Sequence, residues 1–297
     1  LYPRYRCEIE LTELDLDEIE DEVDAAIVAY PHAAAAPVVA EMRGLGLEVV
    51  DLSADFRLVD AAIYERWYGP HGEPELLENA VYGLTELARE QIAEADLVAN
   101  PGCYPTATVL GLAPLAEKGL IESVVIDAKS GVSGAGRGGG DRLSFVNLTE
   151  NASPYGLGGH RHTPEIEQEL TRLASSASRP GATRSWEGRL TFVPHLLPLD
   201  QGLLASCYVD LAEPMSEDAL RDLFRSRYAD ERFVSVVDAP PGVRDVRDSN
   251  RCHIHVASLG ERRAGVFSAI DNLWKGAAGQ AIQNLNLMLG FDEGEGL

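Results

Sequence analysis

The chain has 297 residues, of which 45% are hydrophobic, and its 48 acidic and 25 basic side chains give a formal net charge of −23. This length allows two globular domains, and the negative charge argues against binding to nucleic acid or to an anionic membrane. No apolar run approaches the roughly 18 residues of a transmembrane helix, and we expect no signal peptide.

The acidic residues are spread along the whole chain, as in "LTELDLDEIEDEVD". Two interpretations of this pattern stay open. It fits an acidic cytoplasmic enzyme of high solubility, and it also fits adaptation to high salt, where screening suppresses self-repulsion.

The first half of the sequence alternates strand-like and helix-like segments. Strands are predicted at 25–30, 47–53 and 95–99, and "AAAPVVAEMRGLG" (34–46) predicts a helix closed by glycine. Strands separated by helices indicate βαβ units and a parallel sheet. Ligands bind at the carboxyl ends of such strands, where the sequence places Pro31-His32, the segment 53–55 and the segment 100–103.

From about residue 121 the pattern changes to longer β-rich runs. These are "SVVIDAKSG", "RLTFVPHLLP", "GLLASCYVDL" and "HIHVASLG". One clear helix is predicted at 216–231 with Ser216 as its cap, and an apolar helix closes the chain. The second half is therefore predicted to be an α+β domain with a mixed or antiparallel sheet.

The four cysteines, Cys7, Cys103, Cys207 and Cys252, are far apart and form no CxxC pair, which argues against a disulfide framework or a zinc site and fits a reducing cytosol. Cys103 follows the turn Asn-Pro-Gly, where a strand becomes a helix. A thiol at a helix N-terminus is expected to have a lowered pKa and to act as a nucleophile. The alternative is a small buried hydrophobic side chain, which is the expectation for the other three.

Two further stretches carry candidate chemistry. "GGHRHTPEIEQEL" (158–170) places His160 and His162 just before a predicted helix with Thr163 as its cap, and either histidine can serve a thiol as general acid or base. A metal site on the two histidines is the less favoured alternative, and no metal is expected. "KSGVSGAGRGGG" (129–140) exposes backbone N–H groups suited to an anion, and Arg137 can clamp a carboxylate or phosphate, although a plain flexible loop explains the glycines as well.

Taken together, these motifs resemble the N-acetyl-gamma-glutamyl-phosphate reductase family, within a clan that includes aspartate-semialdehyde dehydrogenases. The segments that carry the resemblance occur in the family's order along essentially the whole chain. They are "DLSADFR" (51–57), "WYG" (67–69), "VYGLTEL" (81–87), "NPGCYPTA" (100–107), "DAKSGVSGAGR" (127–137), "HRHTPEIEQEL" (160–170) and "AIDNLWKGAAGQAIQNLN" (269–286). The resemblance implies a Rossmann-like dinucleotide-binding domain (1–103 and 265–297) and a catalytic and dimerisation domain (104–264).

The resemblance also implies the chemistry. Cys103 attacks an acyl phosphate, a thioester forms, and hydride from NADPH reduces it to a semialdehyde. His160 is favoured as the acid/base, with His162 not separable from it, and N–H groups at the helix start supply the oxyanion site. The substrate-binding residues implied are Arg57, Asn100, Arg137 and Tyr155. The alternative for Arg57, Arg137 and Tyr155 is a structural hydrogen-bonding role. The cofactor-binding residues implied are Pro31, His32, Ser53, Ser130, Gly131, Ser133, Asn272, Lys275 and Gly276. The alternative for the stretch around Asn272 is a helix cap supplied by Asp271 or Asn272.

Some features leave alternatives open. The family ordinarily opens with a G-x-x-G-x-x-G loop for the pyrophosphate, which this sequence lacks, so we expect its first domain to be incomplete at the N-terminus and its binding of NADP(H) to be weakened. Relatives act on glutamyl or aminoadipyl phosphate attached to a carrier protein, but the acidic surface favours the free N-acetylated metabolite. A thiol hydrolase or acyltransferase and a non-catalytic relative are the rival classes. A homodimer or homotetramer is expected.

Overall fold

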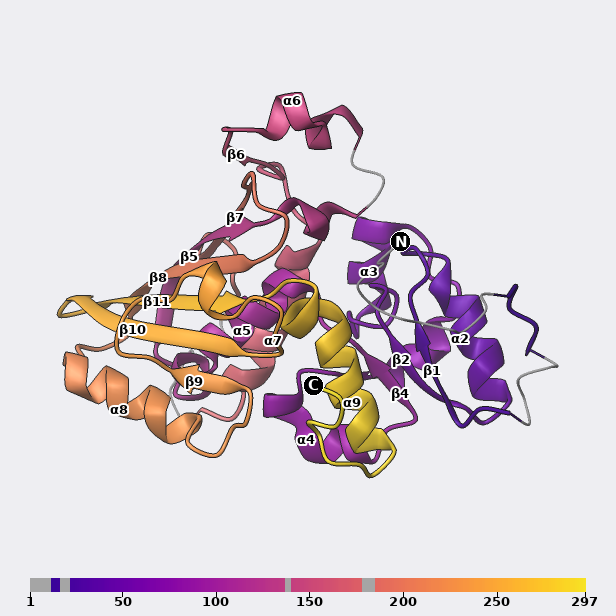
Figure 1. The fold of residues 1–297 in the computed structure, drawn as a ribbon. Helices are drawn as coiled ribbons and strands as arrows, with labels where there is room; N and C mark the ends of the chain where they lie inside the picture. The colour runs from indigo at the N-terminus through magenta and orange to yellow at the C-terminus, as the bar shows by residue number, and fades with distance from the viewer. Residues whose placement is uncertain (1–11, 17–21, 137–139, 178–184) are drawn as a thin grey trace.

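The computed structural model describes residues 12–16, 22–136, 140–177 and 185–297. Its strands form two sheets, one on each side of the molecule (Figure 1). The first is a parallel sheet of four strands in the order β1-β2-β4-β3, and the second is a mixed sheet of seven strands in the order β6-β7-β5-β8-β11-β10-β9. The predicted pairing of a parallel-sheet domain with a mixed-sheet domain is therefore confirmed.

Helices cover both faces of the first sheet. Its strands are β1 (Ala25–Val28), β2 (Glu48–Asp51), β3 (Val81–Tyr82) and β4 (Leu97–Ala99), and the helices around them are α2 (Ala35–Gly44), α3 (Ala61–Tyr68), α4 (Thr85–Ala93) and α9 (Gly279–Met288). Val49 belongs to the core against α2, whereas the next residue, Val50, belongs to the core against α4 and α9. Successive side chains of a strand point to opposite faces, so both faces of this sheet are buried, as parallel sheets require.

The second sheet is covered by helices on one face. Its strands are β5 (Ile121–Ser130), β6 (Ser153–Pro154), β7 (Leu190–Leu196), β8 (Leu203–Leu211), β9 (Val234–Val236), β10 (Cys252–Gly260) and β11 (Arg263–Ile270). The covering helices are α5 (Cys103–Glu117), α7 (His162–Ala174) and α8 (Glu217–Arg227). On the opposite face, Val125 and its cross-strand partner Tyr208 are 44% and 39% exposed.

Short helical segments complete the described chain. They are the 3-10 turns Pro74–Glu78, Val132–Ala135, Gly140–Leu143 and Val243–Asp245, the helix α6 (Phe145–Leu148) and the π-helical turn Trp274–Ala278. α6 and β6 project beyond the body of the second sheet (Figure 1). Within the described residues, no helix combines the length and apolar character needed to cross a membrane.

One predicted helix cap is confirmed and another is wrong. Ser216 caps α8 by accepting a hydrogen bond from the backbone N–H of Ala219, as predicted. Thr163, predicted as a cap, instead lies inside the first turn of α7, because that helix already begins at His162. The return of the chain to the first domain also comes later than the predicted residue 265, because β11 stays paired with β8 through Ile270.

Candidate active site

A cleft of about 240 Å³ lies at the carboxyl ends of β2 and β4, between the two sheet systems. Segments far apart in the sequence contribute to it: the turn before α5, the start of α7, the loop after β5 and the turn after β11. The lining residues are His32, Leu52, Arg57, Asn100, Pro101, Gly102, Cys103, Ser133, Gly134, Gly136, His162, Asn272, Leu273, Gly276 and Ala277. This is where ligands bind in open parallel sheets.

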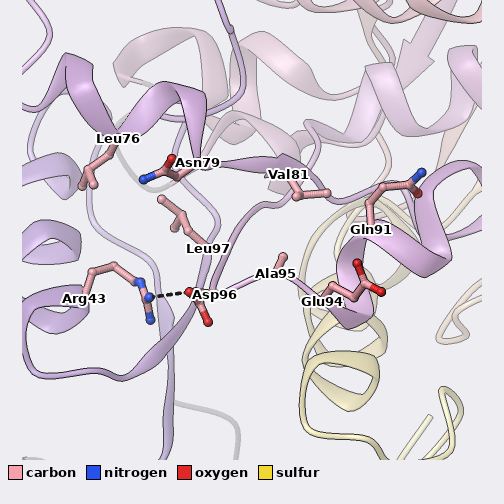
Figure 2. A pocket seen from close by; sticks show the side chains of 9 residues that line it. All are labelled: Arg43, Leu76, Asn79, Val81, Gln91, Glu94, Ala95, Asp96 and Leu97. Atoms are coloured by element: carbon pink, nitrogen blue, oxygen red, sulfur yellow. Dashed lines mark ion pairs between the residues drawn. The ribbon is translucent and has the colours of Figure 1, made fainter.

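A larger hollow of about 410 Å³ lies at the opposite end of β4, near its first residue, Leu97 (Figure 2). Its one ion pair in the figure joins Arg43 to Asp96 across 2.9 Å. Its lining contains no cysteine or histidine. Size alone therefore does not identify the reactive site.

Cys103 is the first residue of α5, directly after the N-cap Gly102. The thiol is partly buried, and burial raises its pKa to about 11. Arg57 and the backbone N–H groups of Tyr104 and Cys103 act in the opposite direction. The expectation that the helix N-terminus lowers the pKa of this thiol is wrong, because desolvation of the thiolate outweighs the helix and the nearby cation.

The structure separates the two histidines. His162 lines the cleft, and its ring lies so close to Gly102 that a Cβ there would be 2.5 Å from Nε2. His160 lies behind it, in a cluster of rings with Tyr104, Tyr155 and Phe192. Its Nδ1 accepts a hydrogen bond from the backbone N–H of His162 at 3.1 Å. Burial lowers both pKa values, to about 4 for His160 and well below the ordinary value for His162, so both rings are neutral at neutral pH.

Arg57 reaches the cleft, but its donors are engaged by the protein. Nε donates to the carbonyl of Asn100 at 2.7 Å, and Nη2 donates to the carbonyl of Leu52 at 2.8 Å. Nη1 lies 3.6 Å from a carboxylate oxygen of Glu165. The guanidinium therefore joins the ends of two strands, and less of it is free to clamp a substrate than the resemblance implies.

Two residues that support the cleft wall from behind, Glu165 and Tyr82, are not predicted from the sequence. The Glu165 carboxylate is 1% exposed and accepts hydrogen bonds from the Gly102 backbone N–H and the Tyr82 hydroxyl, each at 2.8 Å. The spacing in the sequence could have indicated Glu165, since it follows His162 by three residues and so lies on the same face of the helix. Tyr82 offered no such signal.

The remaining substrate candidates lie at or beyond the edge of the cleft. Asn100 lines it, but its side chain donates to the carbonyl of Ala277 and accepts from Asn284. Tyr155 donates to the hydroxyl of Tyr104 at 3.1 Å and is not part of the lining. Arg137 lies outside the described residues.

The cofactor candidates divide into two groups. His32, Ser133, Asn272 and Gly276 line the cleft, and Asn272 links its two walls by donating to Ser133 Oγ at 3.1 Å. The others, Pro31, Ser53, Ser130, Gly131 and Lys275, do not line it.

Internal contacts account for most of the second group. Ser53 donates to Asp51, and a Cβ at Gly131 would lie 2.6 Å from the carbonyl of Asp200. Lys275 is fully buried, and its ammonium lies 2.6 Å from Glu86. Of the two residues predicted as a cap here, Asp271 accepts hydrogen bonds from the backbone N–H groups of Leu273 and Trp274, just before the π-helical turn. Among the described residues, no group of three or more His, Cys, Asp or Glu side chains is placed to hold a metal ion.

Comparisons with known proteins give one consistent result. Residues 2–95 match the family model "Semialdehyde dehydrogenase, NAD binding domain", and residues 103–272 match "Semialdehyde dehydrogenase, dimerisation domain". The chain is 48% identical to the N-acetyl-gamma-glutamyl-phosphate reductase of Moorella thermoacetica, covering 98% of this chain and 82% of that protein. It is 47% identical to that of Dehalococcoides mccartyi, covering 99% and 83%.

Solved structures show the same fold at much lower identity. Aspartate semialdehyde dehydrogenase II from Vibrio cholerae superposes with a TM-score of 0.68 at 18% identity, over 94% of this chain and 82% of that one. The enzyme from Francisella tularensis superposes with a TM-score of 0.65 at 14% identity, over 93% and 84%. At these identities the likeness establishes the fold alone.

Proposed function

This chain belongs to the N-acetyl-gamma-glutamyl-phosphate reductase family, and we propose that the cleft around Cys103 is its active site. The reaction is the NADPH-dependent reduction of N-acetyl-gamma-glutamyl phosphate to N-acetylglutamate 5-semialdehyde and phosphate, a step of arginine biosynthesis. One observation carries the assignment of the site: the thiol at the start of α5 shares the cleft with the His162 imidazole.

Cys103 begins the reaction by attack on the acyl-phosphate carbonyl carbon. The raised pKa of Cys103 keeps the thiol protonated at neutral pH, and the neutral imidazole of His162 accepts its proton as the C–S bond forms. Phosphate leaves with the electrons of the C–O bond and takes a proton from solvent water to become hydrogen phosphate, so a thioester remains on Cys103. Backbone N–H groups at the start of α5 stabilise the charge on the carbonyl oxygen during this step.

NADPH, when bound, supplies the hydride that reduces the thioester. His162, protonated in the first step, donates its proton to the resulting alkoxide, which gives a thiohemiacetal on Cys103. The same imidazole then accepts the hydroxyl proton, the C–S bond breaks with its electrons on sulfur, and the aldehyde is released. The proton returns to the thiolate.

The residues of the cleft fit the nicotinamide end of this cofactor. Gly134, Gly136 and Gly276 line it without side chains, so backbone can approach a flat ring closely. His32, Ser133 and Asn272 would hold the cofactor beside Cys103. The sequence contains no G-x-x-G-x-x-G loop for the pyrophosphate.

We also infer that the protein forms a homodimer, or a tetramer built from such dimers, through the uncovered face of the second sheet. The match to a dimerisation-domain family over residues 103–272 supports this, as do the exposed and cross-paired Val125 and Tyr208. Light scattering of the wild type and of Tyr208→Asp tests it: the variant should have half the mass or less.

The proposed site is tested by trapping the thioester. Without NADPH, the acyl phosphate should leave an N-acetylglutamyl group on the peptide that contains Cys103, detected by mass spectrometry. No adduct, or an adduct on Cys207 or Cys252, would contradict the assignment. If the adduct forms only from an acyl phosphate attached to a carrier protein, the substrate is carrier-linked glutamyl or aminoadipyl phosphate, reduced by the same chemistry.

A further inference from the structure

The turn that carries Cys103 is held from two sides. At one end of the turn, Arg57, which follows β2, donates a hydrogen bond from Nε to the carbonyl of Asn100 at 2.7 Å. Glu165, on α7, holds the other end by accepting from the N–H of Gly102 at 2.8 Å. Arg57 and Glu165 come from different domains and form an ion pair, with Nη1 of Arg57 3.6 Å from Oε2 of Glu165.

Both members of this pair are buried. Glu165 is 1% exposed and Arg57 is 6% exposed. A charge in such surroundings is retained only when it is paired and hydrogen-bonded, because desolvation costs several kcal/mol per ion. Here Tyr82 donates a further hydrogen bond to the pair, at Glu165 Oε1. The pair is thus built into the wall behind the nucleophile, and neither residue forms the exposed clamp expected of a substrate-binding group.

We propose that Glu165 is a positioning residue for the reaction: its carboxylate fixes the Gly102–Cys103 turn and balances the charge of Arg57 beside the thiol. The proposal rests on the proposed role of Cys103 as the nucleophile. Glu165 itself does not line the cleft, so it acts through Gly102 and Arg57.

Arg57 and Glu165 shift the pKa of the Cys103 thiol in opposite directions. Within the described residues, the titratable and charged groups around the thiol are Arg57, Glu165, His162 and Tyr104, and His32 lines the same cleft. Arg57 favours the thiolate and Glu165 opposes it. Removing the carboxylate therefore leaves an uncompensated cation beside the sulfur, whereas removing the guanidinium leaves an uncompensated anion.

Glu165→Gln and Arg57→Gln test the proposal against a matched control. Glu169→Gln is that control, since Glu169 lies one turn further along α7, is equally buried at 1%, and pairs with Arg172 away from the cleft. Two quantities are measured for each variant: the pH midpoint of iodoacetamide alkylation of Cys103, followed by peptide mapping, and the kcat and KM of phosphate-dependent NADP⁺ reduction.

The expected result is a pair of opposite shifts. Glu165→Gln should lower the alkylation midpoint by about one pH unit, and Arg57→Gln should raise it by a similar amount. Glu165→Gln should also lower kcat by about 10²-fold with KM nearly unchanged, because a neutral amide oxygen holds the Gly102 N–H less strongly than the carboxylate and leaves Arg57 unpaired beside the turn. Glu169→Gln should match the wild type in both measurements.

Shifts of the same sign in both variants would overturn the proposal, because a merely loosened turn exposes the thiol in either case. A Glu165→Gln variant indistinguishable from Glu169→Gln would also overturn it. If Glu165→Gln does not fold, Glu165→Asp replaces it, because this variant keeps the charge but has a shorter side chain. A low kcat together with the wild-type pH midpoint of alkylation supports the proposal. A wild-type kcat contradicts it. Alkylation reports the pKa of the Cys103 thiol and does not require turnover. A wild type that shows no turnover would therefore contradict the proposed function, while the alkylation midpoints would still test the role of Glu165.

Discussion

The imidazole of His162 packs directly on Gly102: a Cβ built on this glycine would lie 2.5 Å from Nε2 and 2.8 Å from Cε1 of the ring. The backbone of Gly102 has ordinary extended angles, φ −68° and ψ 152°, so space and not backbone conformation requires glycine here. The proposed acid/base thus packs on the residue that directly precedes the proposed nucleophile, and this residue has no side chain.

Gly102→Ala should therefore displace His162 and lower kcat by about 10²-fold. Overpacking should also lower the free energy of unfolding by about 1–3 kcal/mol. Steady-state kinetics and urea unfolding measure the two effects. Gly44→Ala is the control, since a Cβ there meets nothing within 4 Å and alanine favours the helix. Unchanged kcat in Gly102→Ala would argue against His162 as the acid/base.

His160→Asn should separate the structural histidine from the reactive one. The folded pKa of His160, about 4, lies below its unfolded value of about 6.5, so the unfolded state binds the extra proton between these pH values. The stability due to neutral His160 is present above pH 6.5 and is lost as pH falls towards 4. Thermal unfolding should show the wild type losing more stability than His160→Asn across this range. Parallel curves for the two proteins would show that His160 does not carry the effect.

Lys275→Met should act on stability and not on cofactor binding. Its ammonium bonds to Glu86 at 2.6 Å and to Gln283 at 2.7 Å with no exposure to solvent. Removing one member of a buried pair costs about 3–5 kcal/mol, whereas replacing both with apolar side chains is far less costly. Urea unfolding should therefore show a large loss in Lys275→Met and recovery in Lys275→Met/Glu86→Leu. A raised KM for NADPH at wild-type stability would instead support the cofactor role that the resemblance implies.

Salt should stabilise this protein. The net charge of −23 causes self-repulsion in the compact state, and screening at molar KCl shortens its range to about 3 Å. The midpoint of thermal unfolding should rise steadily from low to molar KCl. A midpoint that does not depend on KCl would contradict adaptation to high salt and leave solubility as the explanation of the charge.

Local patterns predicted the parts of the site that depend on sequence order. The strand–turn–helix around Cys103, the H-x-H pair before α7 and the two types of sheet could all be predicted, because periodicity and turn residues determine them locally. The relative placement of these parts could not. Glu165 meets Gly102 across 63 positions of the chain, and the partner of Lys275 is Glu86, 189 positions away.

The shift in the pKa of Cys103 also depends on the placement of segments that are distant in the sequence. A helix N-terminus favours the thiolate, and this much follows from the sequence. Burial by the second domain opposes it and determines the result. Likewise, the sequence could not separate His160 from His162, because their spacing of two says nothing about which ring faces the thiol.

The most direct test of the account is phosphate-dependent reduction of NADP⁺ with N-acetylglutamate 5-semialdehyde as substrate, followed by the absorbance of NADPH. The wild type should form NADPH only when phosphate is present, and Cys103→Ser should lose at least about 10³-fold in kcat. Cys252→Ser is the matched control, since Ser268 lies 3.4 Å from the sulfur as a hydrogen-bond partner, and it should keep the wild-type rate. Phosphate-dependent turnover that survives in Cys103→Ser would contradict a thioester on Cys103.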